Sequence, residues 1–140
     1  PPIKFNIEFA EKKVTWAKYA VGRWIWPSFR MVVLLNNYQN KSPEYIRAYL
    51  HANSNDGEWE AKYYMFTNRE NEDKNKPNEE LRIEPKTKEK VALFISNYEI
   101  GTAEPKPMPD IDRDTLKLVI ETESGNMFTL PIRSGWISNG

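Results

Sequence analysis

The sequence predicts an all-β domain in which two antiparallel sheets pack face to face as a sandwich. Aromatic residues make up 13% of the 140 residues, and flat aromatic side chains with β-branched neighbours suit a pleated, half-buried surface. Apolar and polar residues alternate in short segments, which is the period of a strand with one face in water. Turn-forming clusters separate these segments, so we expect about eight or nine short strands around one core in a single domain.

The N-terminal region predicts one strand followed by a less regular segment. Residues 3–9 alternate between apolar and polar side chains, as a strand requires. The next apolar residues are spaced three and four apart, like one face of a helix: Val14, Ala17, Val21 and Trp24. We expect a short helix or an irregular crossing up to residue 21, then a short strand over 24–26. Residues 1–28 should therefore form an irregular segment packed on a sandwich core of residues 29–132.

The strands of the core follow in order. Residues 29–35 are apolar at both odd and even positions, which predicts a central strand covered on both faces. Residues 45–50 alternate, with Ile46 and Leu50 expected to point inward. Five more strands are predicted at residues 59–66, 81–83, 91–95, 116–120 and 127–132, the last two joined as a hairpin.

Composition excludes several classes of function. Twenty Lys and Arg balance twenty Asp and Glu, whereas nucleic-acid binders usually carry a basic excess, so we do not expect a nucleic-acid partner. The sequence has no Cys, which removes disulfides, thiolate zinc sites and Cys nucleophiles. No apolar run reaches the length of about 20 residues that a membrane span needs. The chain begins Pro1-Pro2 without Met, so we expect a processed or excised piece of a larger or membrane-anchored protein; its compartment stays open.

An acidic loop before residue 116 is a candidate calcium site. Four carboxylates match positions 1, 3, 5 and 12 of an EF-hand loop: Asp110, Asp112, Asp114 and Glu121. The position that needs Gly holds Thr115, and prolines occupy the place of the entering helix. We therefore interpret the segment as a solvated acidic loop, with a looser calcium site as the alternative.

Residues for catalysis are sparse. His51 is the only histidine and follows a predicted strand beside a polar turn, where a surface or edge position is expected. No serine lies in a Gly-x-Ser-x-Gly elbow, and the six glycines are isolated, so no phosphate-binding loop is predicted. We expect a protein without catalytic activity, bound cofactor or metal.

Tryptophans offer a second candidate site. Trp24 and Trp26 would lie on the same face of a strand, about 7 Å apart. If these two rings or Trp59 are exposed, they could stack on sugars, as in carbohydrate-binding sandwiches. If they are buried, they are core anchors that hide a large apolar area. We prefer the core interpretation.

The order of strands and turns resembles the immunoglobulin-like sandwiches of bacterial membrane-anchored or enzyme-associated proteins. The resemblance covers residues 29–132 and rests on three stretches: VVLLNN at 32–37, LRIEP at 81–85 leading into KVALFI at 90–95, and TLKLVI-ETESGN-MFTLPI at 115–132. It implies a sandwich architecture and a binding role. It transfers no site residue.

These observations predict a non-catalytic protein-interaction or regulatory domain. Its partner would be another protein, bound at a sheet face, an edge strand or the loops at residues 53–57, 67–80 and 101–114, because loops on rigid scaffolds often carry recognition. The alternative function is a carbohydrate-binding module that uses the tryptophan platform.

Overall fold

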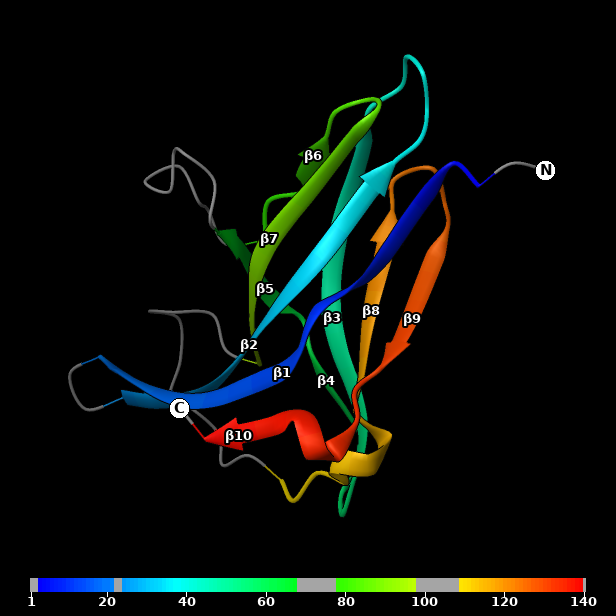
Figure 1. Ribbon diagram of the computed structural model, residues 1–140. Helices are drawn as coiled ribbons and strands as arrows, with labels where there is room; N and C mark the ends of the chain where they lie inside the picture. Colours follow the sequence, from blue (N-terminus) through cyan, green and yellow to red (C-terminus); the bar gives the residue numbers. More distant parts are fainter. Residues whose placement is uncertain (1–2, 22–23, 68–77, 98–108, 140) are drawn as a thin grey trace.

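Two β-sheets lie face to face and enclose one apolar interior (Figure 1). The computed structural model describes residues 3–21, 24–67, 78–97 and 109–139, and it describes side chains outside residues 17–27. The predicted all-β, two-sheet sandwich is confirmed.

Sheet A has five strands, and sheet B has five strands of which four follow one path. In spatial order, sheet A contains β10 (Ile137–Asn139), β1 (Phe5–Val21), β2 (Trp24–Asn37), β7 (Thr87–Ser96) and β5 (Tyr63–Thr67). Sheet B contains β4 (Gly57–Ala61), β3 (Glu44–Ser54), β8 (Lys117–Thr122) and β9 (Met127–Pro131), and β6 (Leu81–Ile83) also pairs with β3. All pairings are antiparallel except that of β1 with β10.

Two short 3-10 helices, η2 (Arg113–Thr115) and η3 (Ser134–Trp136), complete the described elements. Neither has the length or apolar character that a membrane-crossing helix needs, and the described residues contain no other helix.

The core is built from alternate residues of the facing strands. On β3, for example, Ile46 and Leu50 are fully buried, while Arg47 between them is exposed, as the sequence predicts. Fully burying one Leu or Ile side chain stabilises the fold by about 1.5–3 kcal/mol. The largest fully buried side chains come from both sheets: Val14, Met31, Val33, Leu35, Ile46, Leu50, Ile83, Leu93, Ile95, Leu116, Leu118 and Ile120.

The short helix or irregular crossing predicted up to residue 21 is wrong, because residues 5–21 form the long strand β1. Phe9 pairs with Val33, but Val14 pairs with Met31, so β1 carries a bulge of extra residues between Phe9 and Val14. The bulge moves the buried positions from odd to even residues. That change broke the alternation of apolar and polar residues along this part of the sequence. The boundary predicted at residue 29 is wrong for the same reason, since β1 is an internal strand of sheet A.

Three other element boundaries differ from the prediction. β2 runs without interruption through Pro27, which pairs with Lys18. The single strand predicted over residues 59–66 is two strands, β4 and β5, which belong to different sheets and are separated by Lys62. The short strand β10 was not predicted. The predicted hairpin at the end of the core is confirmed as β8 and β9.

Buried polar side chains connect the strands at one end of the sandwich. Asn37 is 1% exposed at the end of β2. Its amide nitrogen donates to the carbonyl oxygens of Ser42 at 3.0 Å and Ile83 at 3.1 Å, and its Oδ1 accepts from the backbone N–H of Gln39 at 3.1 Å. The side chain therefore joins β2, the following turn and β6.

Glu44 makes a similar link at the start of β3. The residue is buried, and its Oε2 accepts a hydrogen bond from the Ser124 hydroxyl at 3.1 Å. Ser124 lies in the turn between β8 and β9 and also contacts the Thr122 hydroxyl at 3.0 Å. The carboxylate thus holds the β8–β9 turn against β3.

Replacing Asn37 by alanine is expected to destabilise the domain by about 2–3 kcal/mol, because the buried Ile83 carbonyl would lose its donor. Asn36→Ala is the matched control, since Asn36 is the neighbouring residue on the opposite face of β2, and its effect should stay within about 0.5 kcal/mol. Urea unfolding followed by tryptophan fluorescence measures both variants. Equal stability of the two would show that the Asn37 bonds contribute little.

Candidate functional site

Trp59 cannot contribute to the predicted tryptophan platform. This residue is 7% exposed and belongs to the core, where its ring lies edge-on to Phe29 with centroids 6.0 Å apart. A ring enclosed in this way presents no free face to a sugar. The side chains of Trp24 and Trp26 lie outside the described residues, so sugar stacking by these two residues stays a prediction.

The acidic loop is organised by backbone hydrogen bonds. Asp112 Oδ1 accepts from the N–H of Asp114 at 3.1 Å and caps η2. Asp110 contributes its backbone N–H to Asn55 Oδ1, also at 3.1 Å. Within the described part of the chain, no three His, Asp or Glu side chains gather into a possible metal site. The segment after Thr115 continues as strand β8, whereas an EF-hand would place a helix there.

His51 lies on the outer face of sheet B with its side chain 25% exposed. Its Nε2 is 3.8 Å from Glu58 Oε2 on the neighbouring strand β4. His51 and Glu58 therefore form a cross-strand pair at the surface.

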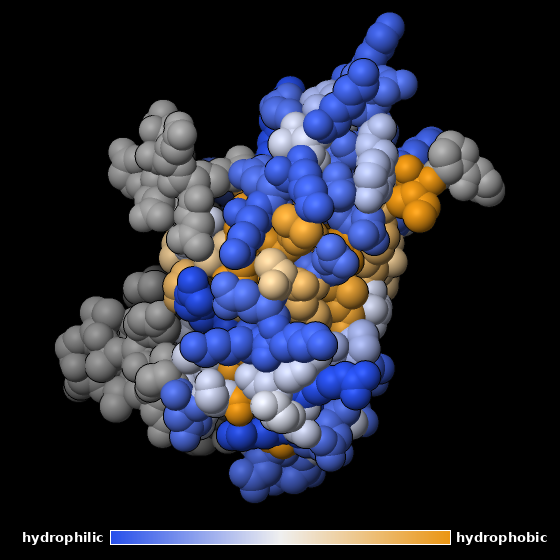
Figure 2. Space-filling model, viewed as in Figure 1, coloured by the Kyte–Doolittle hydropathy of each residue, from blue (hydrophilic) through white to orange (hydrophobic). Residues whose placement is uncertain are grey.

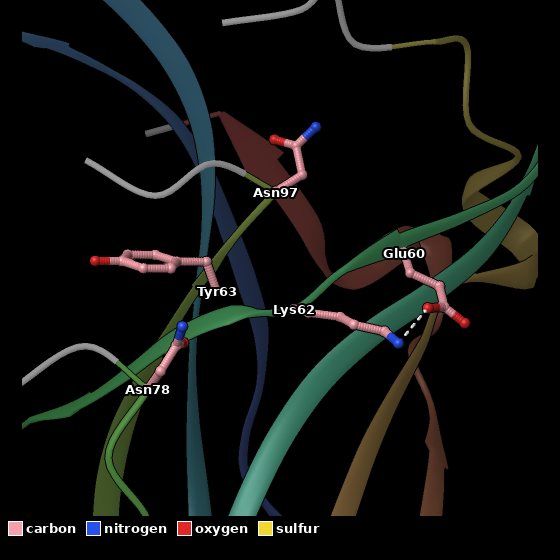
Figure 3. Close-up of a pocket in the computed structure, with 5 residues that line it drawn as sticks. All are labelled: Glu60, Lys62, Tyr63, Asn78 and Asn97. Atoms are coloured by element: carbon pink, nitrogen blue, oxygen red, sulfur yellow. Dashed lines mark ion pairs between the residues drawn. The ribbon is translucent and has the colours of Figure 1, made fainter. Parts of the chain in front are cut away.

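An open hollow of about 520 Å³ lies beside β4 and β5. Five polar residues line it: Glu60, Lys62, Tyr63, Asn78 and Asn97 (Figure 3). Lys62 and Glu60 point toward one another, with Lys62 Nζ 3.0 Å from Glu60 Oε2. The hydrogen bond that the Lys62 ammonium donates to this carboxylate raises the pKa of Lys62, which keeps Lys62 protonated and unsuited to act as a base.

Tyr64 holds Asn78, one of the residues that line this hollow, through two hydrogen bonds. Its backbone N–H donates to Asn78 Oδ1 at 2.9 Å, and its hydroxyl donates to the Asn78 carbonyl at 3.3 Å. The residue is 5% exposed. Burial raises the pKa of Tyr64 to about 12, because the low-polarity surroundings disfavour the phenolate.

The outer face of sheet A carries a group of apolar side chains, which we call the sheet A outer patch. By strand register they point away from the core: Val32, Leu34, Met65, Ala92 and Phe94. Val32 is 3% exposed and Ala92 is fully buried, yet neither belongs to the core cluster between the sheets. Figure 2 shows apolar residues gathered over the middle of this side of the molecule, with hydrophilic residues around them.

Charged residues at the border of the patch are mainly cationic. Lys88 and Lys90 on β7, Arg30 on β2 and Glu8 on β1 share the outer face by register. The Arg30 guanidinium lies 5.9 Å from the centre of the Phe94 ring, within the range of a cation–π contact. Among the described residues that strand register places on this face, three cations and one anion therefore border the apolar centre.

Sequence analysis indicated this patch only in part. The apolar residues at both parities of 29–35 and 91–95 predicted strands with two covered faces, but the pattern did not show that the outer covering would come partly from neighbouring side chains such as Leu34 and Phe94.

No protein-family model matches the sequence, and no curated protein matches it. Among solved structures, it is similar to a chain titled "X-ray structure of Northeast Structural Genomics Consortium target SoR45". The match covers 93% of this chain and 83% of that chain at 12% sequence identity, with a TM-score of 0.37. A likeness of this size establishes neither a shared fold nor a shared function.

Tyr64 should make stability depend on alkaline pH. Its pKa of about 12 in the folded protein exceeds the ordinary tyrosine pKa of 10.0, so its contribution to stability is fully present below pH 10 and is lost as the pH rises toward 12. Ultraviolet titration of the phenolates should show a tyrosine that titrates near pH 12 in the wild type and is absent in Tyr64→Phe, while Tyr49, whose pKa burial also raises, stays in both curves. If the tyrosine that titrates near pH 12 is still present in Tyr64→Phe, its assignment to Tyr64 is wrong.

Proposed function

We propose that this domain is a non-catalytic protein-binding module within a larger protein, and that it engages its partner through the sheet A outer patch. The observation that carries the proposal is the group of half-buried apolar side chains Leu34, Met65 and Phe94, which lie on the outward face of sheet A beside the buried Val32 and Ala92.

The alternation of side chains supports this proposal. An antiparallel sheet with one face in water usually places polar residues on that face. On β2 and β7, the outward positions instead hold Val32, Leu34, Ala92 and Phe94. Contiguous apolar surface with a polar border is typical of sites where proteins bind one another.

The border charges favour a partner with acidic side chains around an apolar segment. Arg30, Lys88 and Lys90 outnumber Glu8 on this face. Complementary charges increase the association rate and fix the orientation of a complex. The long stems of Lys88 and Lys90 can also cover apolar surface while their ammonium groups stay in water.

Leu34→Glu is expected to lower affinity for the partner at least about tenfold, because it places a carboxylate in the apolar centre and opposite an acidic partner. Proteins retained by the immobilised domain from cells of its source would be purified and titrated by calorimetry. Tyr38→Glu is the matched control: Tyr38 is 50% exposed in the turn after β2, so the same change of chemistry there should leave affinity unchanged.

Lys90→Glu tests the charged border without altering the apolar centre. Lys90 is exposed, so the variant should unfold at the wild-type temperature. Its affinity should fall severalfold, with a weaker dependence on salt than the wild type shows. If folded Leu34→Glu and Lys90→Glu both bind every retained protein as tightly as the wild type, the patch is not the binding surface.

A further inference from the structure

The backbone of β9 presents free hydrogen-bonding groups along one edge of sheet B. The N–H of Ile132 donates to the carbonyl of Leu116 at 2.9 Å, and the N–H of Thr122 donates to the carbonyl of Asn126 at 2.9 Å. Hydrogen-bonded and non-hydrogen-bonded pairs alternate along an antiparallel ladder. Given the β8–β9 register, the N–H and C=O groups of Met127 and Thr129 therefore point away from β8.

No described strand pairs with that outward side of β9, which forms the border of sheet B (Figure 1). The opposite border of the sheet is formed by β4, which contains Glu58 and Glu60, and by β6, which contains Arg82. Charged side chains on edge strands discourage pairing with other chains. β9, with the sequence MFTLP, has no charged residue, so it lacks this protection.

The core is least covered along the same border. Several partly buried apolar residues that pack on the core belong to β9 or to the neighbouring β1, η3 and β10: Phe9, Phe128, Leu130, Trp136 and Ile137. Met127 at the start of β9 is 62% exposed. A strand added beside β9 would cover Phe128 and Leu130 while it satisfies the free backbone groups.

We propose that a second copy of this chain pairs here, β9 against β9 in antiparallel orientation, with the two-fold axis at Phe128. In this register Met127 of each copy is opposite Thr129 of the other. Each of these two pairs exchanges two backbone hydrogen bonds, so all four outward N–H groups find an acceptor. The two Phe128 residues then form the close, non-hydrogen-bonded pair, whose side chains meet on the core face.

The ends of β9 favour this register over one centred on Thr129, which would make the same number of backbone hydrogen bonds. Pro131 has no N–H to donate, so a register centred on Thr129 would place Met127 opposite Pro131 and leave two Met127 carbonyls without a donor. The N–H of Gly125 already donates to the Thr122 carbonyl at 3.0 Å in the turn. The pairing is therefore limited to the outward groups of Met127 and Thr129.

A second copy suits this edge better than a charged partner. The chain has a formal net charge of zero, so two copies approach without long-range repulsion, a condition that promotes self-association. The outward residues Met127 and Thr129 are uncharged and self-complementary about one axis, as an isologous interface requires.

Sedimentation equilibrium from about 10 µM to 1 mM protein, the range of weak association, tests the proposal with the full chain. We expect a monomer–dimer equilibrium for the wild type. Thr129→Pro removes one outward N–H donor per copy and leaves the hydrogen bonds between β8 and β9 intact, because residue 129, like Pro131, points its backbone nitrogen away from β8. The variant should weaken dimerisation at least tenfold. Thr129→Val keeps the N–H and the side-chain shape, so it should dimerise like the wild type.

Amide hydrogen exchange of the wild type supplies a second measurement that does not depend on the folding of Thr129→Pro. The N–H groups of Met127 and Thr129 should become protected as protein concentration rises. A wild type that stays monomeric, with fast exchange at both amides across the whole range, overturns the proposal. Protection that arises only when another protein is added overturns it as well, and would assign the edge to that protein.

Discussion

The β-bulge between Phe9 and Val14 is the constraint on which the packing of sheet A against sheet B depends. Without the register shift, Val14 and Trp16 would point to the outer face, because one residue of slippage exchanges the faces of a strand. With it, Trp16 stacks on Phe29 at 6.5 Å, and Phe29 contacts Trp59 of sheet B at 6.0 Å. This row of aromatic rings connects the two layers at the end of the core where β1 and β2 extend furthest.

The strands that sequence analysis placed correctly are those whose alternation is undisturbed. Ile46 and Leu50 on β3 alternate with exposed or half-buried residues, and β6 was predicted at its observed bounds. Only the first part of β1, within residues 3–9, was predicted as strand, because the bulge after Phe9 changes the parity of the buried positions and such a change has no marker in a single sequence. The chain crosses between sheets at Lys62, where Ala61 and Tyr64 are both buried. That change of parity was visible in the pattern, but it was interpreted as one continuous strand.

The candidate site was harder to predict than the fold, since its residues come from three strands far apart in sequence. Val32 and Leu34 on β2, Met65 on β5 and Phe94 on β7 meet only through register. Their composition indicated buried strands, which is correct, but not which face of the sheet each side chain would occupy. Trp59 shows the opposite case: its residue type suggested recognition, and its position after the β3–β4 turn directs it inward.

The outer face of sheet B explains why we propose sheet A as the protein-binding face. Several of its charges are paired with neighbouring residues: Arg82 donates to the Tyr45 hydroxyl at 2.6 Å and pairs with Glu84, Lys62 pairs with Glu60, and Arg47 lies 4.0 Å from Glu121. Each such exposed pair contributes only about 0–1 kcal/mol to stability, but a partner would have to remove water from all of them at once. On the sheet A outer patch, by contrast, Leu34, Met65 and Phe94 are apolar and only half-buried, so covering them releases water at little electrostatic cost. Its cations can stay at the border, in contact with solvent, while the centre is covered.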